Sequence, residues 1–327
     1  MYDVISIGQA TQDVYLVSKR FRIIRDKRFI TGQAECFAFG TKVELDDVLF
    51  EVGGGATNTA VTFSRQGLRT AVVTRVGLDP AGESVKRLLM SYGIYLPFVI
   101  TDPEGRTGYS TIFLTSSGER TILVYRGVSH TLQPNDVSWS KARTRWFYIS
   151  SLAGNIPLLK KALSMARKYR THVALNPGAL ELSRGLRVLG PLIKNVGVLL
   201  VNRSEAATLL RVPYENDRAI VRGMDRVCDG IAVITEGKKG SWVCDGMTVR
   251  KVVINPVKAV DTTGAGDAYG SGFVAGLIKR PGDIDYALRL ASINSASVVQ
   301  QIGAKHGLIL RALPQGKKWM HIKVEKY

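Results

Sequence analysis

Short apolar runs alternate with longer segments of helical periodicity along most of this chain. Several of the runs end beside a Gly or Asn, and they predict strands at 2–7, 71–76, 146–149, 172–175, 196–201 and 230–234. The helical periods fall at 56–66, 82–91, 156–169, 204–210, 267–279 and 284–300. This alternation is typical of an α/β protein with a mainly parallel central sheet and helices on both faces. Binding sites of such sheets lie at the carboxyl ends of the strands.

The length of 327 residues suits two domains or one large α/β unit. No linker rich in Pro, Gly or Ser divides the chain, so we expect a single domain over 1–327. Apolar runs fall far short of a membrane span, and the N-terminus lacks a signal-peptide pattern, which predicts a cytoplasmic protein without membrane contact. The three cysteines form no CxxC pair, which argues against a zinc site or a disulfide framework.

The formal net charge of +18 would suit a nucleic-acid partner or an anionic substrate. The basic residues are scattered, except for a run over 19–28 and a group near the C-terminus. No nucleic-acid motif accompanies them. We therefore favour a solvated basic surface and do not expect nucleic acid as a partner.

Two stretches, about 14–52 and 105–126, interrupt the α/β rhythm. In the second, β-rich runs at 107–114 and 120–125 flank the polar turn 116–119, which predicts a hairpin. A hairpin inserted in an α/β pattern suggests a small β-sheet lid over a ligand. Because such a flap leaves an unpaired edge, the lid could also join two copies of the chain in a homodimer.

A glycine-rich turn stands immediately before the helical period at 267–279. Unhindered N–H groups of Gly264, Ala265 and Gly266 at a helix N-terminus would face a small anion. Asp267 stands beside that anion, where a carboxylate can take a proton from an attacking hydroxyl, as phosphoryl transfer requires. The alternative is a plain tight turn with Asp267 as a helix cap. The G-x-G-x-x-A pattern at 270–275 falls inside the helix rather than in a strand-to-helix turn, which argues against a dinucleotide fingerprint.

The segment 261–267, Asp-Thr-Thr-Gly-Ala-Gly-Asp, resembles the signature of the PfkB family of ribokinase-like carbohydrate kinases. The segment 51–60 is similar to the N-terminal signature of that family, and weaker motifs at 75–82, 175–179, 202–206 and 235–241 extend the resemblance over nearly the whole chain. The resemblance implies a ribokinase-like fold and a phosphotransferase that uses ATP and Mg²⁺ to phosphorylate a sugar hydroxyl. In that family Asp267 would be the general base, and 264–266 would form the anion hole.

The resemblance also implies an acceptor site and a nucleotide site. The acceptor would be held by Asp13, Gly53, Gly54 and Asn58. The nucleotide would be lined by Asn202, Thr235, Gly237, Gly240 and Asn294, the last of these near adenine. Glu205 would hold Mg²⁺ through water, and backbone oxygens near Asp261, Thr263 and Gly303 would bind a monovalent cation such as K⁺.

Several of these residues have simpler explanations. Asp13 could be a solvated loop acid, Asn58 a helix cap, and Glu205 a surface helix residue. The 261–263 segment could be an ordinary turn.

The sequence leaves the identity of the acceptor open. The stretch 18–40 is longer and more basic than the corresponding loop of ribokinase, and three lid arginines could meet an anionic substrate or lie exposed: Arg106, Arg120 and Arg126. A sugar needs mostly polar partners, whereas a nucleoside also needs an apolar slot for its base. Such a slot could come from Phe37, Phe39, Phe50 and Tyr109. A nucleoside kinase is therefore the alternative, and a non-catalytic binding protein on the same fold is a third.

Overall fold

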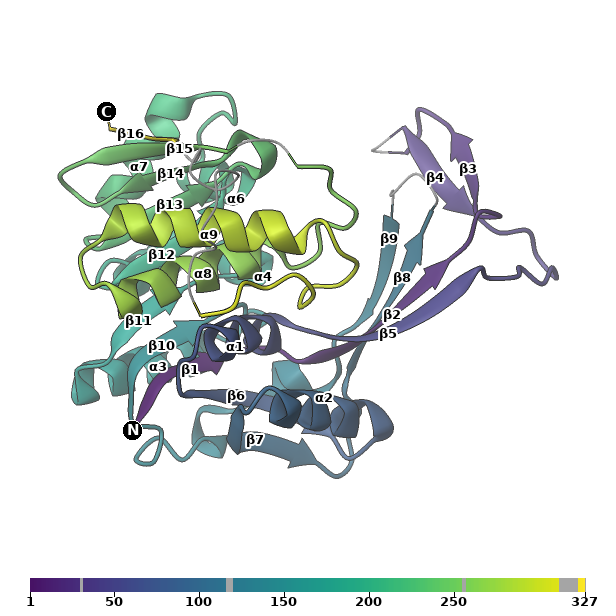
Figure 1. Cartoon of the computed structure of the whole chain (residues 1–327), viewed down its shortest axis with the longest axis horizontal. Coiled ribbons are helices and arrows are strands. Elements are labelled where there is room, and N and C mark those ends of the chain that lie inside the picture. The colour runs from purple at the N-terminus through teal and green to yellow at the C-terminus, as the bar shows by residue number, and fades with distance from the viewer. Residues whose placement is uncertain (30–31, 116–119, 255–256, 312–322, 327) are drawn as a thin grey trace.

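The computed structural model describes residues 1–29, 32–115, 120–254, 257–311 and 323–326. A ten-stranded sheet forms its centre, in the order β16-β15-β14-β13-β12-β11-β10-β1-β6-β7 (Figure 1). Its strands are β1 Tyr2–Ile7, β6 Thr70–Gly77, β7 Tyr95–Asp102, β10 Thr144–Ile149, β11 His172–Leu175, β12 Val198–Asn202, β13 Ile231–Thr235, β14 Ser241–Cys244, β15 Val249–Val253 and β16 Lys323–Lys326.

Seven neighbouring strands of this sheet pair in parallel, in the order β7, β6, β1, β10, β11, β12 and β13. This confirms the mainly parallel sheet. The remaining strands β14, β15 and β16 extend one edge by antiparallel pairing, which the sequence pattern did not predict. The carboxyl ends of β11, β12 and β13 therefore lie next to one another.

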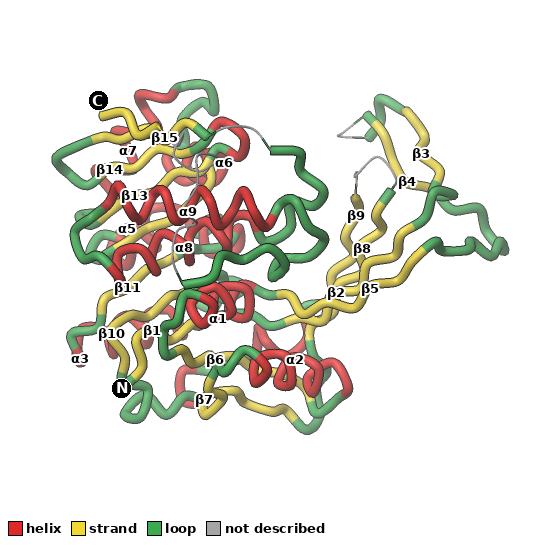
Figure 2. Tube along the Cα trace, viewed as in Figure 1, coloured by secondary structure: helices red, strands yellow, loops and turns green. Residues whose placement is uncertain are grey.

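Helices cover both faces of the sheet (Figure 2). They are α1 Gly55–Arg65, α2 Pro80–Ser91, α3 Ile156–Tyr169, α4 Ala179–Leu182, α5 Gly185–Ile193, α6 Arg203–Leu210, α7 Asp217–Val227, α8 Ala265–Lys279 and α9 Ile284–Val298, with 3₁₀ turns η1 Gly127–Thr131, η2 Pro134–Asp136 and η3 Gly237–Lys239. Among the described residues, none of these helices has the length and apolar character to cross a bilayer.

Alternate residues of each strand supply the two layers of core. Leu199 and Val201 of β12 pack with α3, α5, α6 and α7, whereas Val198 and Leu200 pack with α8 and α9 on the other face. Strand side chains point alternately to opposite faces, so a strand buried on both faces is apolar at every position. This explains the short continuous apolar runs.

A second, smaller sheet projects from the body in the order β5-β2-β8-β9 (Figure 1). Its strands are β2 Thr11–Val17, β5 Asp47–Gly53, β8 Gly108–Leu114 and β9 Arg120–Tyr125, and the two-stranded sheet β3 Arg22–Arg25 and β4 Gln33–Cys36 lies at its outer end. We call these six strands the lid. The predicted β8–β9 hairpin pairing is confirmed, and its turn 116–119 lies outside the described residues.

The lid sheet extends beyond the stretch 14–52 by a few residues at its start. Strand β2 already begins at Thr11, so Asp13 lies inside a lid strand. The start of the lid at about residue 14 was therefore predicted a few residues too late, and Asp13 does not lie in a loop. The chain passes from β1 directly into the lid and reaches its first helix only after β5.

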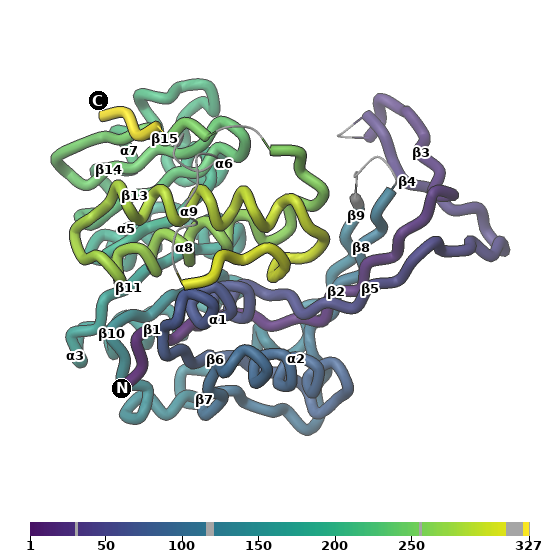
Figure 3. The backbone as a smooth tube through the Cα atoms, in the orientation of Figure 1, coloured from purple at the N-terminus to yellow at the C-terminus, as the bar shows by residue number. Residues whose placement is uncertain are grey.

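Helices from opposite ends of the chain lie side by side at the front of the body. Figure 3 shows α1, from the beginning of the chain, next to α8, which comes from near its end and in turn packs against α9. The α8–α9 contact is close because α8 presents glycines to α9. A Cβ at Gly276 would lie 2.5 Å from the Ala287 Cα, and one at Gly272 would lie 3.0 Å from the Ala291 Cα.

Replacing Gly276 with Ala is expected to lower the free energy of unfolding by about 1–3 kcal/mol, because the helices must separate to admit the methyl group. Gly190→Ala is the matched control. Gly190 also lies within a helix, but a Cβ there would meet nothing within 4 Å, so the change gains up to about 1 kcal/mol of helix propensity. Urea denaturation measures both, and equal stability of the two variants would contradict close α8–α9 packing.

Candidate functional site

The Asp261 side chain holds the turn that precedes α8. Its Oδ1 accepts a hydrogen bond from the Thr263 N–H at 2.8 Å, and its Oδ2 accepts from the Gly303 N–H and the Tyr15 hydroxyl, both at 3.0 Å. Burial raises the pKa of Asp261, but these hydrogen bonds outweigh it and keep the pKa below its usual value. The ionised carboxylate thus ties the turn to the loop after α9 and to the lid strand β2.

The two glycines of this turn are needed for different reasons. Gly264 caps α8 in the left-handed conformation, with φ of 73°, and a Cβ there would lie 2.3 Å from the Ala304 Cβ. At Gly266 a Cβ would meet nothing within 4 Å. Gly264 is therefore required by the fold, whereas Gly266 borders open space.

The N-terminus of α8 presents free backbone donors to that space. Within the described part of the chain, the N–H groups of Gly264, Gly266 and Asp267 have no hydrogen-bond partner. The N–H of Ala265 differs, because it donates to the Thr262 carbonyl at 3.3 Å. Unpaired donors at the positive end of a helix dipole form a site for an anion.

Asp267 lies half-buried beside these donors and is held by α1. Its Oδ2 accepts a hydrogen bond of 2.8 Å from the Asn58 Nδ2. Burial raises the pKa of Asp267, opposed by this hydrogen bond and by the charge of Lys305. Gly54, not Asn58, caps α1, so Asn58 is free to join the two helices.

Asp13 faces the same region from the lid. It lies opposite Glu51 and Ser110 in the lid sheet, is 8% exposed, and its Oδ1 accepts a hydrogen bond from the Thr11 hydroxyl at 2.9 Å. Burial raises its pKa. A solvated loop acid would not be enclosed in this way.

The glycine pair at 53–54 allows the chain to approach Asp13. A Cβ at Gly53 would lie 1.9 Å from the Asp13 Oδ2, and one at Gly54, whose φ is 92°, would lie 2.4 Å from the Gln9 carbonyl oxygen. Larger residues would displace the lid strand from the helix that carries Asn58.

Sequence reasoning missed one member of this cluster, Lys305. It is 3% exposed, and its Nζ donates to the Val52 carbonyl and to the Asn58 Oδ1. Burial lowers its pKa to about 8, against the opposing charges of Asp13, Asp267 and Glu51. A single lysine after α9 forms no local pattern, so only its place in the fold identifies it.

Two cavities meet at the start of α8. One of about 220 Å³ is lined by Asn202, Glu205, Gly264 and Asp267, among others. The other, of about 420 Å³, is lined by Gly237, Gly240, Tyr269 and Ser295, among others. Thr235, Thr262, Ala265 and Gly266 line both cavities, so the space beside Asp267 continues into the larger one.

Asn202 and Glu205 form the first turn of α6. The Asn202 side chain accepts from the Glu205 N–H at 2.9 Å, and the Glu205 carboxylate accepts from the Asn202 N–H at 2.8 Å. Glu205 therefore completes a capping box with Asn202, the N-cap of α6, and also borders the smaller cavity. Burial raises its pKa.

Asn294 does not lie where the sequence argument placed it. Its side chain is fully buried between α8 and the chain after α9, where Nδ2 donates to the Ala268 carbonyl and Oδ1 accepts from the Ile309 N–H. The α9 residues that do line the larger cavity are Ser292, Ser295 and Ala296. The interpretation of Asn294 as an adenine contact was therefore wrong, because it faces the core and its polar atoms are already paired.

The aromatic candidates lie away from Asp13. Phe50 and Tyr109 neighbour Glu51 and Ser110 in their strands, so they point to the opposite face, where they line another cavity with Arg106. Phe37 packs against Phe21 and Phe113, and Phe39 is fully exposed. Arg126 is exposed, and the side chain of Arg120 lies outside the described residues.

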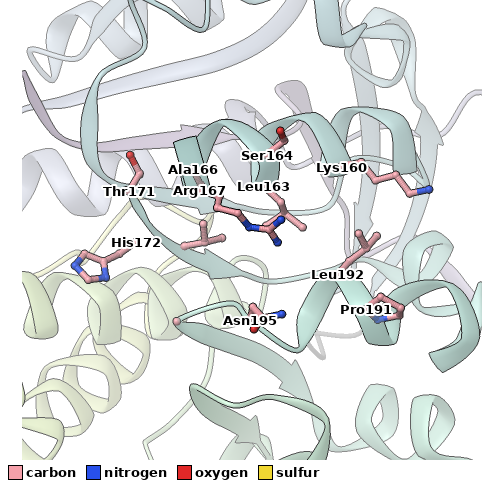
Figure 4. Close-up of a pocket in the computed structure, with 12 residues that line it drawn as sticks. Lys160, Leu163, Ser164, Ala166, Arg167, Thr171, His172, Pro191, Leu192 and Asn195 are labelled. Atoms are coloured by element: carbon pink, nitrogen blue, oxygen red, sulfur yellow. The ribbon is translucent and has the colours of Figure 1, made fainter. Parts of the chain in front are cut away.

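A cavity of about 390 Å³ between α3 and α5 is lined by Lys160, Arg167, His172 and Asn195, among others (Figure 4). His172 begins strand β11, so this cavity lies at the amino ends of the strands. It is separate from the site at α8, which lies at the carboxyl ends as expected for this architecture.

The model of the pfkB family of carbohydrate kinases matches residues 1–310. The chain belongs to the PfkB family. This assignment makes it a phosphotransferase and agrees with the resemblance carried by the segments 51–60 and 261–267.

Relatives and solved structures support the family. An uncharacterized sugar kinase of Archaeoglobus fulgidus is 32% identical over 75% of this chain and 97% of that protein. The structure of an adenosine kinase from Sinorhizobium meliloti matches with a TM-score of 0.77 at 23% identity, covering 95% of this chain and 97% of that one. A putative ribokinase II from E. coli, solved with ATP and Mg²⁺, matches with a TM-score of 0.76 at 17% identity, covering 94% and 96%. The structural matches show the ribokinase-like fold.

Asp267→Asn is expected to lower the kcat of this PfkB-family kinase by about 10²–10⁴-fold, because an amide keeps the shape of the side chain but does not accept the proton. Its affinity for ATP should change little. A coupled assay of ADP release and a calorimetric titration with ATP measure the two quantities. Near-normal turnover of Asp267→Asn would contradict a role for Asp267 as base.

Gly266→Val is expected to lose activity, whereas Gly264→Val is expected to lose stability. The side chain of valine at 266 enters the cavities without meeting the protein, so the fold should persist while ATP binding and phosphoryl transfer fall. Valine at 264 meets Ala304 and requires a left-handed backbone, so it should lower the Tm. Thermal melts and ADP release measure the contrast, and normal kinetics of a folded Gly266→Val would make this turn merely structural.

Proposed function

We propose that this kinase transfers the γ-phosphoryl group of ATP to a hydroxyl of a small neutral sugar, with Asp267 as general base. The observation that carries the proposal is the position of Asp267. Its half-buried carboxylate lies between unpaired N–H groups at the start of α8 and a polar wall formed by the buried side chains of Asp13 and Asn58. An anion and a hydroxyl can therefore reach it from opposite sides.

The residues around α8 suit ATP and Mg²⁺. The larger cavity, with Thr235, Gly237 and Gly240, would hold the nucleoside part of ATP, and the space open at Gly266 would hold its phosphates. Glu205 and Asn202 supply oxygen atoms at the edge of the smaller cavity, which suits an ion that keeps most of its water shell. When bound, Mg²⁺ would neutralise charge on the phosphates.

A monovalent cation forms part of the same proposal. Backbone oxygens of Asp261, Thr263 and the Gly303 loop would bind K⁺ behind the anion hole. The Asp261 carboxylate already brings these segments together through its hydrogen bonds to the N–H groups of Thr263 and Gly303.

In the reaction, Asp267 would take the proton of the acceptor hydroxyl while its oxygen attacks the γ-phosphorus. The bond from that phosphorus to the β–γ bridging oxygen breaks, and ADP leaves. The N–H groups of Gly264, Gly266 and Asp267 stabilise charge on the transferring group. Burial raises the pKa of Asp267, which makes the carboxylate a stronger base than a solvated aspartate.

The acceptor wall favours a sugar over a nucleoside. Asp13, Glu51 and Asn58 offer it hydrogen-bonding oxygens, whereas Phe50 and Tyr109 face the other side of the lid sheet. The three carboxylates Asp13, Glu51 and Asp267 also disfavour a substrate that carries a phosphate or carboxylate of its own. The intact base and glycine turn argue against a non-catalytic binding protein.

The lid provides a basis for dimerisation. Strand β9 forms one edge of the lid sheet and exposes Leu123, Val124 and Tyr125. We include in the proposal that two copies pair through this edge, because an exposed strand edge with apolar side chains favours association.

A substrate panel tests the proposal. Purified protein is assayed for ADP release with pentoses, hexoses, their acid and phosphate derivatives, and nucleosides. We expect turnover with at least one neutral sugar and little with acids or phosphates. If only nucleosides are phosphorylated, the sugar assignment is wrong and the acceptor is a nucleoside.

Asp13→Ala should raise the KM for the preferred sugar and lower kcat/KM by about 10²-fold, because a charge-assisted hydrogen bond is lost and its partner is left unpaired. The KM for ATP should stay within about twofold, since Asp13 lies on the lid away from the nucleotide cavities. Gln12→Ala is the control. Gln12 is the neighbouring residue of β2 and points to the opposite face. Equal losses in the two variants would contradict acceptor binding by Asp13.

A further inference from the structure

An unbroken chain of hydrogen bonds runs from Lys305 to Asp267. The Lys305 Nζ donates to the Asn58 Oδ1, and the Asn58 Nδ2 donates to the Asp267 Oδ2 at 2.8 Å. A second bond, from Nζ to the Val52 carbonyl, fixes the ammonium group to the end of strand β5. The Asn58 amide therefore stands between a cation and an anion.

This placement leaves the amide one favourable orientation. A flipped Asn58 would turn its NH₂ group toward the ammonium of Lys305 and its oxygen toward the carboxylate of Asp267. Both contacts would be repulsive, and both lie in a buried region where polar groups without partners are costly. Lys305 thus decides which end of Asn58 meets Asp267.

Lys305 is also the buried cation that balances the acids around it. Asp13 from β2, Glu51 from β5 and Asp267 from α8 all interact with its charge. The other titratable groups nearby do not replace it. His306 is engaged with Glu51 at 2.8 Å, and Tyr148, beneath Asp267 on β10, is a neutral phenol buried within the sheet.

We propose that Lys305 is a positioning residue for phosphoryl transfer, which orients the Asn58 amide toward Asp267 and keeps that carboxylate ionised. The inference rests on the proposed function of Asp267 as base. Lys305 does not contact the reacting atoms in this role. It acts on the base through Asn58 and through its charge.

The first test replaces Lys305 with Met, which keeps the apolar stem and removes the charge. We expect kcat to fall by about 10²-fold at neutral pH because Asn58 and Asp267 lose their fixed geometry, with the KM for ATP within about twofold. In the pH profile of kcat, the acid limb is the range where kcat falls as the pH decreases. This limb should move up by about one pH unit, because an ionised Asp267 loses the positive charge of Lys305. A folded Lys305→Met with normal kcat and an unmoved limb overturns the proposal.

Two variants separate charge and position from general packing. Lys279→Met removes a half-buried lysine at the other end of α8, whose Nζ donates to Gln66 and to the Arg311 carbonyl, and should leave kcat and its pH limb unchanged. Lys305→Arg keeps the positive charge and should keep the acid limb at its original pH, even if its larger head group lowers kcat. If Lys305→Met does not fold, Lys305→Arg decides, and a shifted limb in that variant overturns the proposal.

A double-mutant cycle tests the route through Asn58. In an Asn58→Ala background, Lys305→Met should lower kcat by a clearly smaller factor than in the original protein, because the two residues act as one chain. If Lys305→Met lowers kcat by the same factor in both backgrounds, Lys305 does not act through Asn58, and this part of the proposal is overturned. Asp267→Asn is measured in parallel. If it retains turnover, the proposed base fails, whereas an inactive Asp267→Asn with a normal Lys305→Met rejects only the positioning role.

Discussion

A hydrogen bond of 2.8 Å between Asn58 and Asp267 joins helices α1 and α8, which come from opposite ends of the chain. The bond requires both helices to begin at the same edge of the sheet, and it lies at the junction of the lid, the body and the cavities. Gly54 and Gly264 make it geometrically accessible, because each begins its helix with a positive φ that larger residues rarely adopt. The proposed acceptor and nucleotide sides of the site would meet at this bond.

The second constraint is the balance of buried charge. Asp13 is buried and Asp267 is half-buried, and burial alone would favour the neutral form of each carboxyl group. The positive charge of Lys305 favours the ionised forms of both carboxyl groups. Lys305 can itself be buried because these carboxylates compensate its charge. The proposed base, Asp267, thus has a counter-ion among the neighbouring side chains. The lid contributes part of this arrangement, since Asp13 and Glu51 belong to its strands.

Some features of the site could be predicted because they are local. Gly264, Gly266 and Asp267 occupy neighbouring positions before a helix, so their shared geometry follows from turn and helix-terminus chemistry. The fate of Asn294 could not be predicted in this way. Helical periodicity places it on α9, but the residues that pack against each side of α9 decide whether it meets the cavity or the core. Lys305 belongs to no pattern at all.

The sequence by itself determined the alternation of strands and helices, the lid hairpin and the glycine turn, because each depends on residues close together in the chain. Only the tertiary structure decided which side chains meet. Asp13 and Gln12 are neighbours in β2, yet Asp13 faces the cluster around Lys305 and Gln12 faces the cavity lined by Phe50 and Tyr109, since a shift of one residue reverses the face of a strand. Lys305 reaches Asn58 across 247 positions because the loop after α9 packs against the start of α1, and no local rule encodes that contact.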